Sequence, residues 1–131
     1  MRITRRKQRT RSGATTVEFA IVVPIILTLF LGSIELTRMN FIRQTAANAA
    51  YEAARKAIVP GNTAQDAHTE ALRLLNTLGV GQGATVAVAS TLSRVTVTVT
   101  IPISQNSWGL TRFTGGLNVT QSCGLTLEAV R

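Results

Sequence analysis

The sequence predicts an α+β protein: a long N-terminal transmembrane helix continues into an extracytoplasmic domain with a second helix and a small antiparallel sheet. Three observations predict this class. An apolar stretch near the N-terminus is long enough to span a membrane, the residues after it keep a helical period, and the last part alternates as strands do. The predicted parts are a basic cytoplasmic leader at 1–13, a transmembrane helix at 14–34 and an extracytoplasmic α+β domain at 35–131.

The predicted transmembrane helix has one charged residue, Glu18. At a rise of about 1.5 Å per residue the segment 14–34 is about 31 Å long, which matches a hydrocarbon core of about 30 Å. A central acidic side chain costs a membrane helix about 2.5 to 3.5 kcal/mol, so a specific role for Glu18 is one interpretation. The other is that Glu18, one turn from the basic flank, reaches the lipid headgroups or is protonated.

The charge of the chain is concentrated in its leader. The net charge is +8, and the part after Gly13 holds all six acids but only eight of the 14 basic residues. Basic residues before an apolar span favour the cytoplasmic side, so the N-terminus is expected inside and the chain after Ile34 outside. A nucleic-acid-binding arm is also basic, but this arm adjoins an apolar span and lacks aromatic residues that stack on bases. We therefore expect a membrane as a partner and no nucleic acid.

A cleaved secretory signal peptide is a less favoured interpretation of the same N-terminus. The apolar core is longer than the usual 7 to 15 residues, and it runs into GSIELTR at 32–38 without an obvious A-x-A site. Small residues precede the core instead, at Ser12, Gly13 and Ala14. Cleavage there would remove the basic arm and keep the helix.

The segment around these small residues contains four motifs: GATTVEFA at 13–20, Pro24, ELTR at 35–38 and the alanine-rich AANAAYEAAR at 46–55. In these motifs the chain resembles the TadE-like pseudopilins of tight-adherence (Flp) pilus systems. In type IV prepilins a peptidase on the cytoplasmic side cuts after a glycine, and a glutamate is fifth in the mature chain. The resemblance is specific over 13–55 and general after that.

The resemblance implies processing between Gly13 and Ala14 and roles in assembly for Glu18, Phe19 and Pro24. Its implied partners are a prepilin peptidase, other pilins or pseudopilins and the pilus assembly platform in the bacterial inner membrane. Many type IV pilins carry Phe or Met where this chain has Ala14, so methylation of the new N-terminus is less expected than cleavage. The alternative is an uncleaved, signal-anchored envelope protein whose outer domain binds a partner.

Cleavage would change the electrostatics around Glu18. The nitrogen of Ala14 is a neutral amide before cleavage and an amine that can carry positive charge afterwards. Ala14 and Glu18 are four residues apart and so share a helix face, and a neighbouring chain can supply the same amine. Opposite charges attract more strongly at low dielectric, although desolvation cancels much of the gain. Pro24 removes a donor and is expected to kink or loosen the helix near Ala20.

The helical pattern continues to about Val59 and ends at Pro60-Gly61. Within it Glu52 is spaced to pair with Arg55 or Lys56. One face carries mainly small residues: Met39, Ile42, Ala46, Ala49, Ala53 and Ala57.

A second helix is predicted after this turn, capped by Asn62 or Thr63, with Asp66 at capping-box spacing. The glycine-rich stretch 79–83 is expected to end it as a flexible joint. Its apolar face comprises Ala64, Ala67, Ala71, Leu74, Leu75 and Leu78.

Three strands are predicted next. Alternation from Val95 to Ile103 is a strong signal, 85–90 is a weaker strand that pairs with it through 91–93, and 117–129 alternates again. Pro102 suits a sheet edge or a strand end. The helices are expected to cover the apolar face of this sheet.

No catalytic or cofactor site is predicted, because the chain has one histidine, one cysteine and six acids, without the spacing of a metal site. We expect neither an enzyme nor a cofactor. Cys123 is expected to be a buried small hydrophobic residue and His68 to lie at the surface or boundary. Trp108 and Phe113, in the loop 104–116, are expected in a packed lid or a contact surface.

Overall fold

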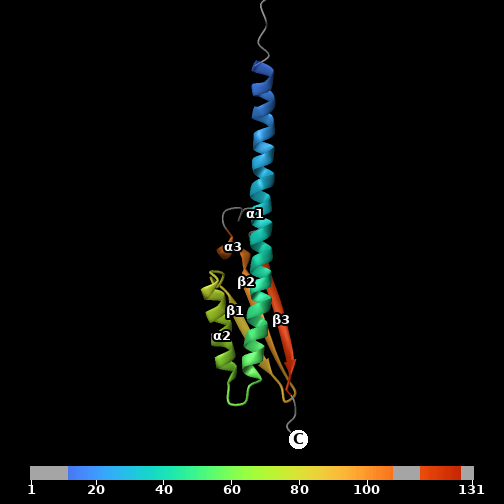
Figure 1. Ribbon diagram of the computed structural model, residues 1–131. Helices are drawn as coiled ribbons and strands as arrows, with labels where there is room; N and C mark the ends of the chain where they lie inside the picture. Colours follow the sequence, from blue (N-terminus) through green and yellow to red (C-terminus); the bar gives the residue numbers. More distant parts are fainter. Residues whose placement is uncertain (1–11, 108–115, 128–131) are drawn as a thin grey trace, which may run out of the picture. The chain divides into compact units, whose positions relative to one another are not determined.

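The computed structural model describes residues 12–107 and 116–127 of the chain (Figure 1). It divides into two compact units, Met1–Ile34 and Glu35–Arg131. The predicted α+β class is confirmed: a long apolar helix, a second helix and a three-stranded antiparallel sheet are present. The elements in chain order are α1 (Ser12–Ala57), α2 (Ala64–Thr77), β1 (Thr85–Ser90), β2 (Arg94–Pro102), α3 (Ile103–Asn106) and β3 (Asn118–Thr126).

The described part of the first unit is a single helix, residues 12–34 of α1. The helix continues through Pro24 without a break near Ala20. The hydroxyl of Thr28 donates a hydrogen bond of 2.7 Å to the carbonyl of Pro24, one turn earlier. Most of the basic leader, residues 1–11, lies outside the described residues.

The sheet has the order β1-β2-β3, with antiparallel pairing on both sides of β2. The predicted hairpin between β1 and β2 is confirmed, and its turn is held by the Thr91 N–H, which donates to the Arg94 carbonyl at 2.8 Å. β2 ends at Pro102, so the prediction that Ile103 continues the strand is wrong. Proline suits a strand end because it cannot donate to the ladder, and Ile103 opens α3 while its N–H donates to the Leu117 carbonyl.

The core of the second unit lies between one face of the sheet and the helices. Two helical segments, residues 35–57 of α1 and the whole of α2, lie side by side over this face (Figure 1). The predicted small face of α1 is confirmed at Ile42, Ala46, Ala49 and Ala53, but Thr45, Ala50 and Ala54 are buried too. The buried stripe is wider than predicted because α1 packs in one core with both β2 and α2. The strand side chains at its centre are Val95, Val97, Val99 and Ile101.

The helix α2 begins at the predicted capping box. Thr63 is the N-cap, its N–H donates to Asp66 Oδ2 at 2.8 Å, and its hydroxyl accepts from the Asp66 N–H at 3.3 Å. Hydrogen bonds from the Thr63 hydroxyl and then its backbone lower the pKa of Asp66. The stretch 79–83 is not a loose joint, because Val80 within it is fully buried in the core.

Two ion pairs converge on Glu70 of α2. The Lys56 Nζ lies 3.0 Å from one carboxylate oxygen, and an Arg73 guanidinium nitrogen lies 2.5 Å from the other. Hydrogen bonds from Arg73 and then Lys56 lower the pKa of Glu70 to about 2. Lys56 therefore pairs with α2 and not with Glu52 in its own helix, the partner that sequence spacing indicates. This pair links α1 to α2 at the surface.

Ala53→Leu should destabilise the folded unit by about 1–3 kcal/mol, because Ala53 is fully buried and a larger side chain would force α1 away from its neighbours. Ala47→Leu is the matched control, since Ala47 is exposed on the same helix and should change the stability by less than about 0.5 kcal/mol. Urea unfolding of both variants in detergent, followed by circular dichroism, measures the difference. Equal midpoints would contradict close packing at Ala53.

Candidate processing and assembly segment

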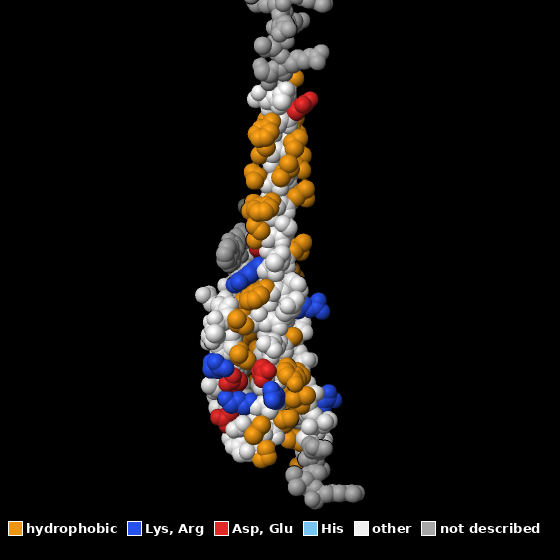
Figure 2. Space-filling model, in the orientation of Figure 1, with side chains coloured by type: hydrophobic (Ala, Val, Ile, Leu, Met, Phe, Trp, Pro, Cys, Tyr) orange, Lys and Arg blue, Asp and Glu red, His pale blue; other side chains and the backbone are white. Residues whose placement is uncertain are grey.

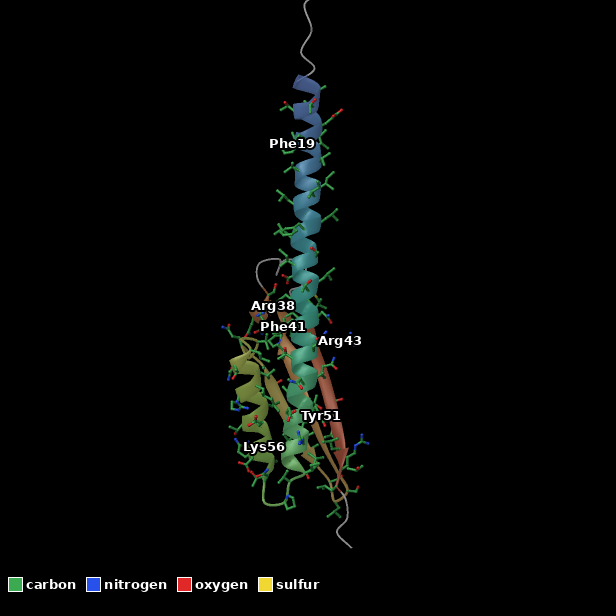
Figure 3. The ribbon with its side chains drawn as sticks, viewed as in Figure 1. Phe19, Arg38, Phe41, Arg43, Tyr51 and Lys56 are labelled. Carbon is green, nitrogen blue, oxygen red and sulfur yellow. The ribbon has the colours of Figure 1, made fainter. Side chains whose placement is uncertain are left out.

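The five sequence-predicted site residues lie in about the first three and a half turns of one helix and are all exposed. Ala14 and Glu18 are spaced four residues apart in α1, so they occupy one face of it. Phe19 is 69 % exposed (Figure 3). Pro24, further along, is exposed as well. The group thus forms a local stretch of helix surface and not an enclosed pocket.

Gly13 is not required by the fold. A Cβ built on Gly13 meets no atom within 4 Å, and the residue lies in α1 without a positive φ. Glycine inside a helix is less favourable than alanine by about 1 kcal/mol. Among the described residues, helix geometry and packing therefore give no reason for glycine at this position.

The helix between Gly13 and Ile34 has no buried side chain among its residues. Figure 2 shows apolar side chains along this part of the molecule. Within the described residues one helix, Gly13–Ala57, is long and apolar enough to cross a membrane, a test that a signal sequence also passes. The large apolar side chains exposed between Gly13 and Ile34 are those of Val17, Phe19, Ile21, Val22, Ile25, Ile26, Leu27, Leu29, Phe30, Leu31 and Ile34.

A second polar site occurs at the start of the other unit. We call it the junction cluster and define it as Glu35, Arg38, Asn106 and Ser107. Glu35 is only 7 % exposed, and its carboxylate accepts a hydrogen bond from the Ser107 hydroxyl. The Arg38 guanidinium donates to the carbonyls of Asn106 at 3.2 Å and Gly79 at 3.3 Å.

Asn106 completes the junction cluster from α3. Its side-chain amide donates to the carbonyls of Gln82 at 2.8 Å and Pro102 at 3.0 Å. The Arg38 guanidinium also lies 5.6 Å from the centre of the Phe41 ring (Figure 3). The hydrogen bonds of the cluster connect α3 and the residues after α2 with the first turn of residues 35–57.

Sequence reasoning missed the roles of Glu35 and Arg38. Their spacing of three residues suggests a pair within one helix, but Glu35 bonds a residue 72 positions away and Arg38 residues 41 and 68 positions away. The sequence did contain one indication of a role for Glu35: this carboxylate directly follows the apolar span, and the helical pattern continues after it. Only the position of α3 identifies its partners.

The other residues considered in the sequence are His68, Cys123, Trp108 and Phe113. His68 is partly buried, as expected for a boundary position. Cys123 was expected to be buried but is only half-buried, because β3 is an edge strand where coverage by the helices ends. Across residues 12–107 and 116–127, no group of three or more His, Cys, Asp or Glu side chains is arranged to hold a metal ion. Trp108 and Phe113 lie outside the described residues.

The apolar helix and the folded unit after it fit a single-pass membrane protein with one α+β domain. Residues 13–55 match the sequence model of a family described as TadE-like protein, so the resemblance to that family is confirmed over this segment. The match begins at Gly13 and ends within α1, before α2 and the sheet. Comparisons with curated proteins and with solved structures found no match.

Ser107→Ala should destabilise the second unit by about 1–3 kcal/mol, because it removes a donor from the buried carboxylate of Glu35. Ser104→Ala is the control: Ser104 is exposed in the neighbouring α3 and should change little. Hydrogen exchange of the full-length protein in detergent should show faster exchange near α3 for the first variant only. Identical exchange in both variants would contradict a stabilising role for this bond.

Proposed function

We propose that this chain is a TadE-like minor pilin or pseudopilin that acts in the assembly or initiation of a tight-adherence pilus. The observation that carries the proposal is the family match over 13–55, which coincides with the apolar helix and its alanine-rich continuation. The chain is anchored in the bacterial inner membrane, with its N-terminus in the cytoplasm and residues 35–131 outside. The basic leader supports this orientation.

A prepilin peptidase cuts the chain between Gly13 and Ala14 in this proposal. Two observations support the site: the family match begins at Gly13, and the fold itself gives no reason for a glycine there. Recognition by the peptidase then accounts for the small residue. The exposed start of α1 agrees with access by an enzyme from outside the chain.

The mature helix then packs against the helices of other pilins or pseudopilins at the assembly platform. In that step its exposed apolar side chains leave their contacts with lipid and pack against other protein helices. The new amine of Ala14, in the same chain or a neighbour, becomes the partner of Glu18. Phe19 and Pro24 belong to the packing surface, and Pro24 weakens the helix where packing requires it to adapt.

An uncleaved signal-anchored protein would share the helix and the folded unit. Its outer domain would bind an envelope partner, and the basic leader would stay attached. Intact mass separates the two functions, since only the pseudopilin loses residues 1–13.

The protein isolated from membranes of cells with an active prepilin peptidase should begin at Ala14, as measured by intact-mass spectrometry. Gly13→Leu should yield the full-length chain because a bulky residue blocks the cut. Gly32→Leu is the matched control, since Gly32 lies in the same helix with no atom near a built Cβ and should leave processing unchanged. Unmodified protein that still begins at Met1 would sink the pseudopilin assignment.

Glu18→Ala should insert and be cleaved normally, because it removes a charge that disfavours insertion and lies beyond the cleaved bond. Co-purification with other pilins, or pilus formation, should be lost. Glu18→Gln keeps the size and hydrogen bonding but removes the charge, so failure of both variants would support an ionic pair. If both variants support pili like the parent, the carboxylate has no role in assembly.

A further inference from the structure

Over the described residues the sheet of the second unit ends in β3, a strand with no charged side chain of its own. Its register with β2 runs unbroken from Arg94↔Thr126 to Pro102↔Asn118, so the strand has no bulge. It is the outermost strand of the described sheet, and its outward row of backbone groups pairs with no further strand there (Figure 1). Edge strands are usually guarded by charges, proline or bulges. The sequence of β3, NVTQSCGLT, has none of these.

The apolar layer under the sheet is incomplete at both of its edges. The central side chains of β2, such as Val97 and Val99, are fully buried. Their neighbours in the core are only half-buried: Val86 and Val88 on β1, and Cys123 and other residues on β3. β1, with the sequence TVAVAS, is also uncharged. A strand added beside either edge would remove more apolar surface from water.

Strand direction limits what the added strand can be. All copies anchored in one membrane leave it on the same side, and a contact between second units that share one orientation is compatible with this anchoring. Antiparallel pairing of β3 with β3 would reverse one copy. β1 and β3 both run antiparallel to β2, so they are parallel to each other. β3 of one copy can therefore pair with β1 of the next while both copies keep the same orientation.

We propose that β3 is a docking edge for a second copy of this chain, which adds its β1 as a parallel strand. Each copy offers one edge of each kind, so the contact is head-to-tail and can extend beyond two copies. The helices of successive copies then cover the same face of one continuous sheet. The contact depends on a shared orientation and on the two edges, and it does not depend on the pilus function proposed above.

The single cysteine of the chain makes this contact testable. Cys123 lies on β3, opposite Val97, and Val88 of β1 lies opposite Val97 from the other side. Two strand spacings separate Val88 from Cys123 within one copy, about 10 Å, which exceeds the limit of about 7 Å for a disulfide. Val88→Cys therefore cannot cross-link to Cys123 within the chain. In adjacent copies the two strands are neighbours.

Full-length Val88→Cys protein in membranes should form disulfide-linked dimers, trimers and larger species after mild oxidation, seen on a non-reducing gel. Val86→Cys, on the same face of β1, tests the neighbouring register. Adding Cys123→Ser to either variant leaves one thiol per copy and should remove every species larger than a dimer. Thr98→Cys, on the opposite face of the central strand, is the control and should give no ladder.

A ladder with either β1 variant that needs Cys123 supports the proposal. Only monomers and dimers with both variants would overturn it. A Cys123-linked dimer of the unmodified protein would overturn it too, because it would place β3 against β3. A ladder of equal strength with Thr98→Cys would reflect random collision and would also count against the proposal.

Discussion

The unit Glu35–Arg131 depends on the apolar core that α1 shares with α2 and the sheet. Alanines on α1 leave room for the valines of β2 and for the small face of α2, and all three elements share one core. Ile42 and Leu75 are the largest fully buried side chains contributed by α1 and α2. Because the buried side chains of α1 and α2 are mostly alanines, a larger residue at one of these positions would disturb the packing of the other elements in the core.

Periodicity was sufficient to predict most of this fold. The alternation of valine and threonine in β2 and the capping box at Thr63 specify their elements locally, and both are confirmed. The misses occur where tertiary contacts decide. Ile103 continues the alternating pattern but follows a proline that ends the strand, and Lys56 finds Glu70 across a helix pair that sequence spacing does not reveal.

The candidate segment was proposed from the sequence on a different basis. Gly13, Glu18 and the basic leader differ in composition from the apolar segment beside them. They can therefore be identified without knowledge of any tertiary contact. The junction cluster was hidden because Glu35 and Ser107 become neighbours only when the chain folds. The two sites therefore differ in kind: one is an exposed segment of a single helix, and the other is a set of hydrogen bonds between residues far apart in the sequence.

The paired surroundings of Glu70 make the link between α1 and α2 tolerant of acid. An ordinary glutamate has a pKa of 4.5, whereas Arg73 and Lys56 hold that of Glu70 at about 2. A pKa that is lower in the folded than in the unfolded chain stabilises the folded state. This stabilisation is complete at pH values above the unfolded pKa, and it is lost as the pH falls from about 4.5 through about 2. Both pairs involve a solvent-exposed cation, so each contributes little to the stability of the fold. In mildly acidic surroundings the carboxylate nevertheless keeps its charge, and the two helices stay joined at their surface.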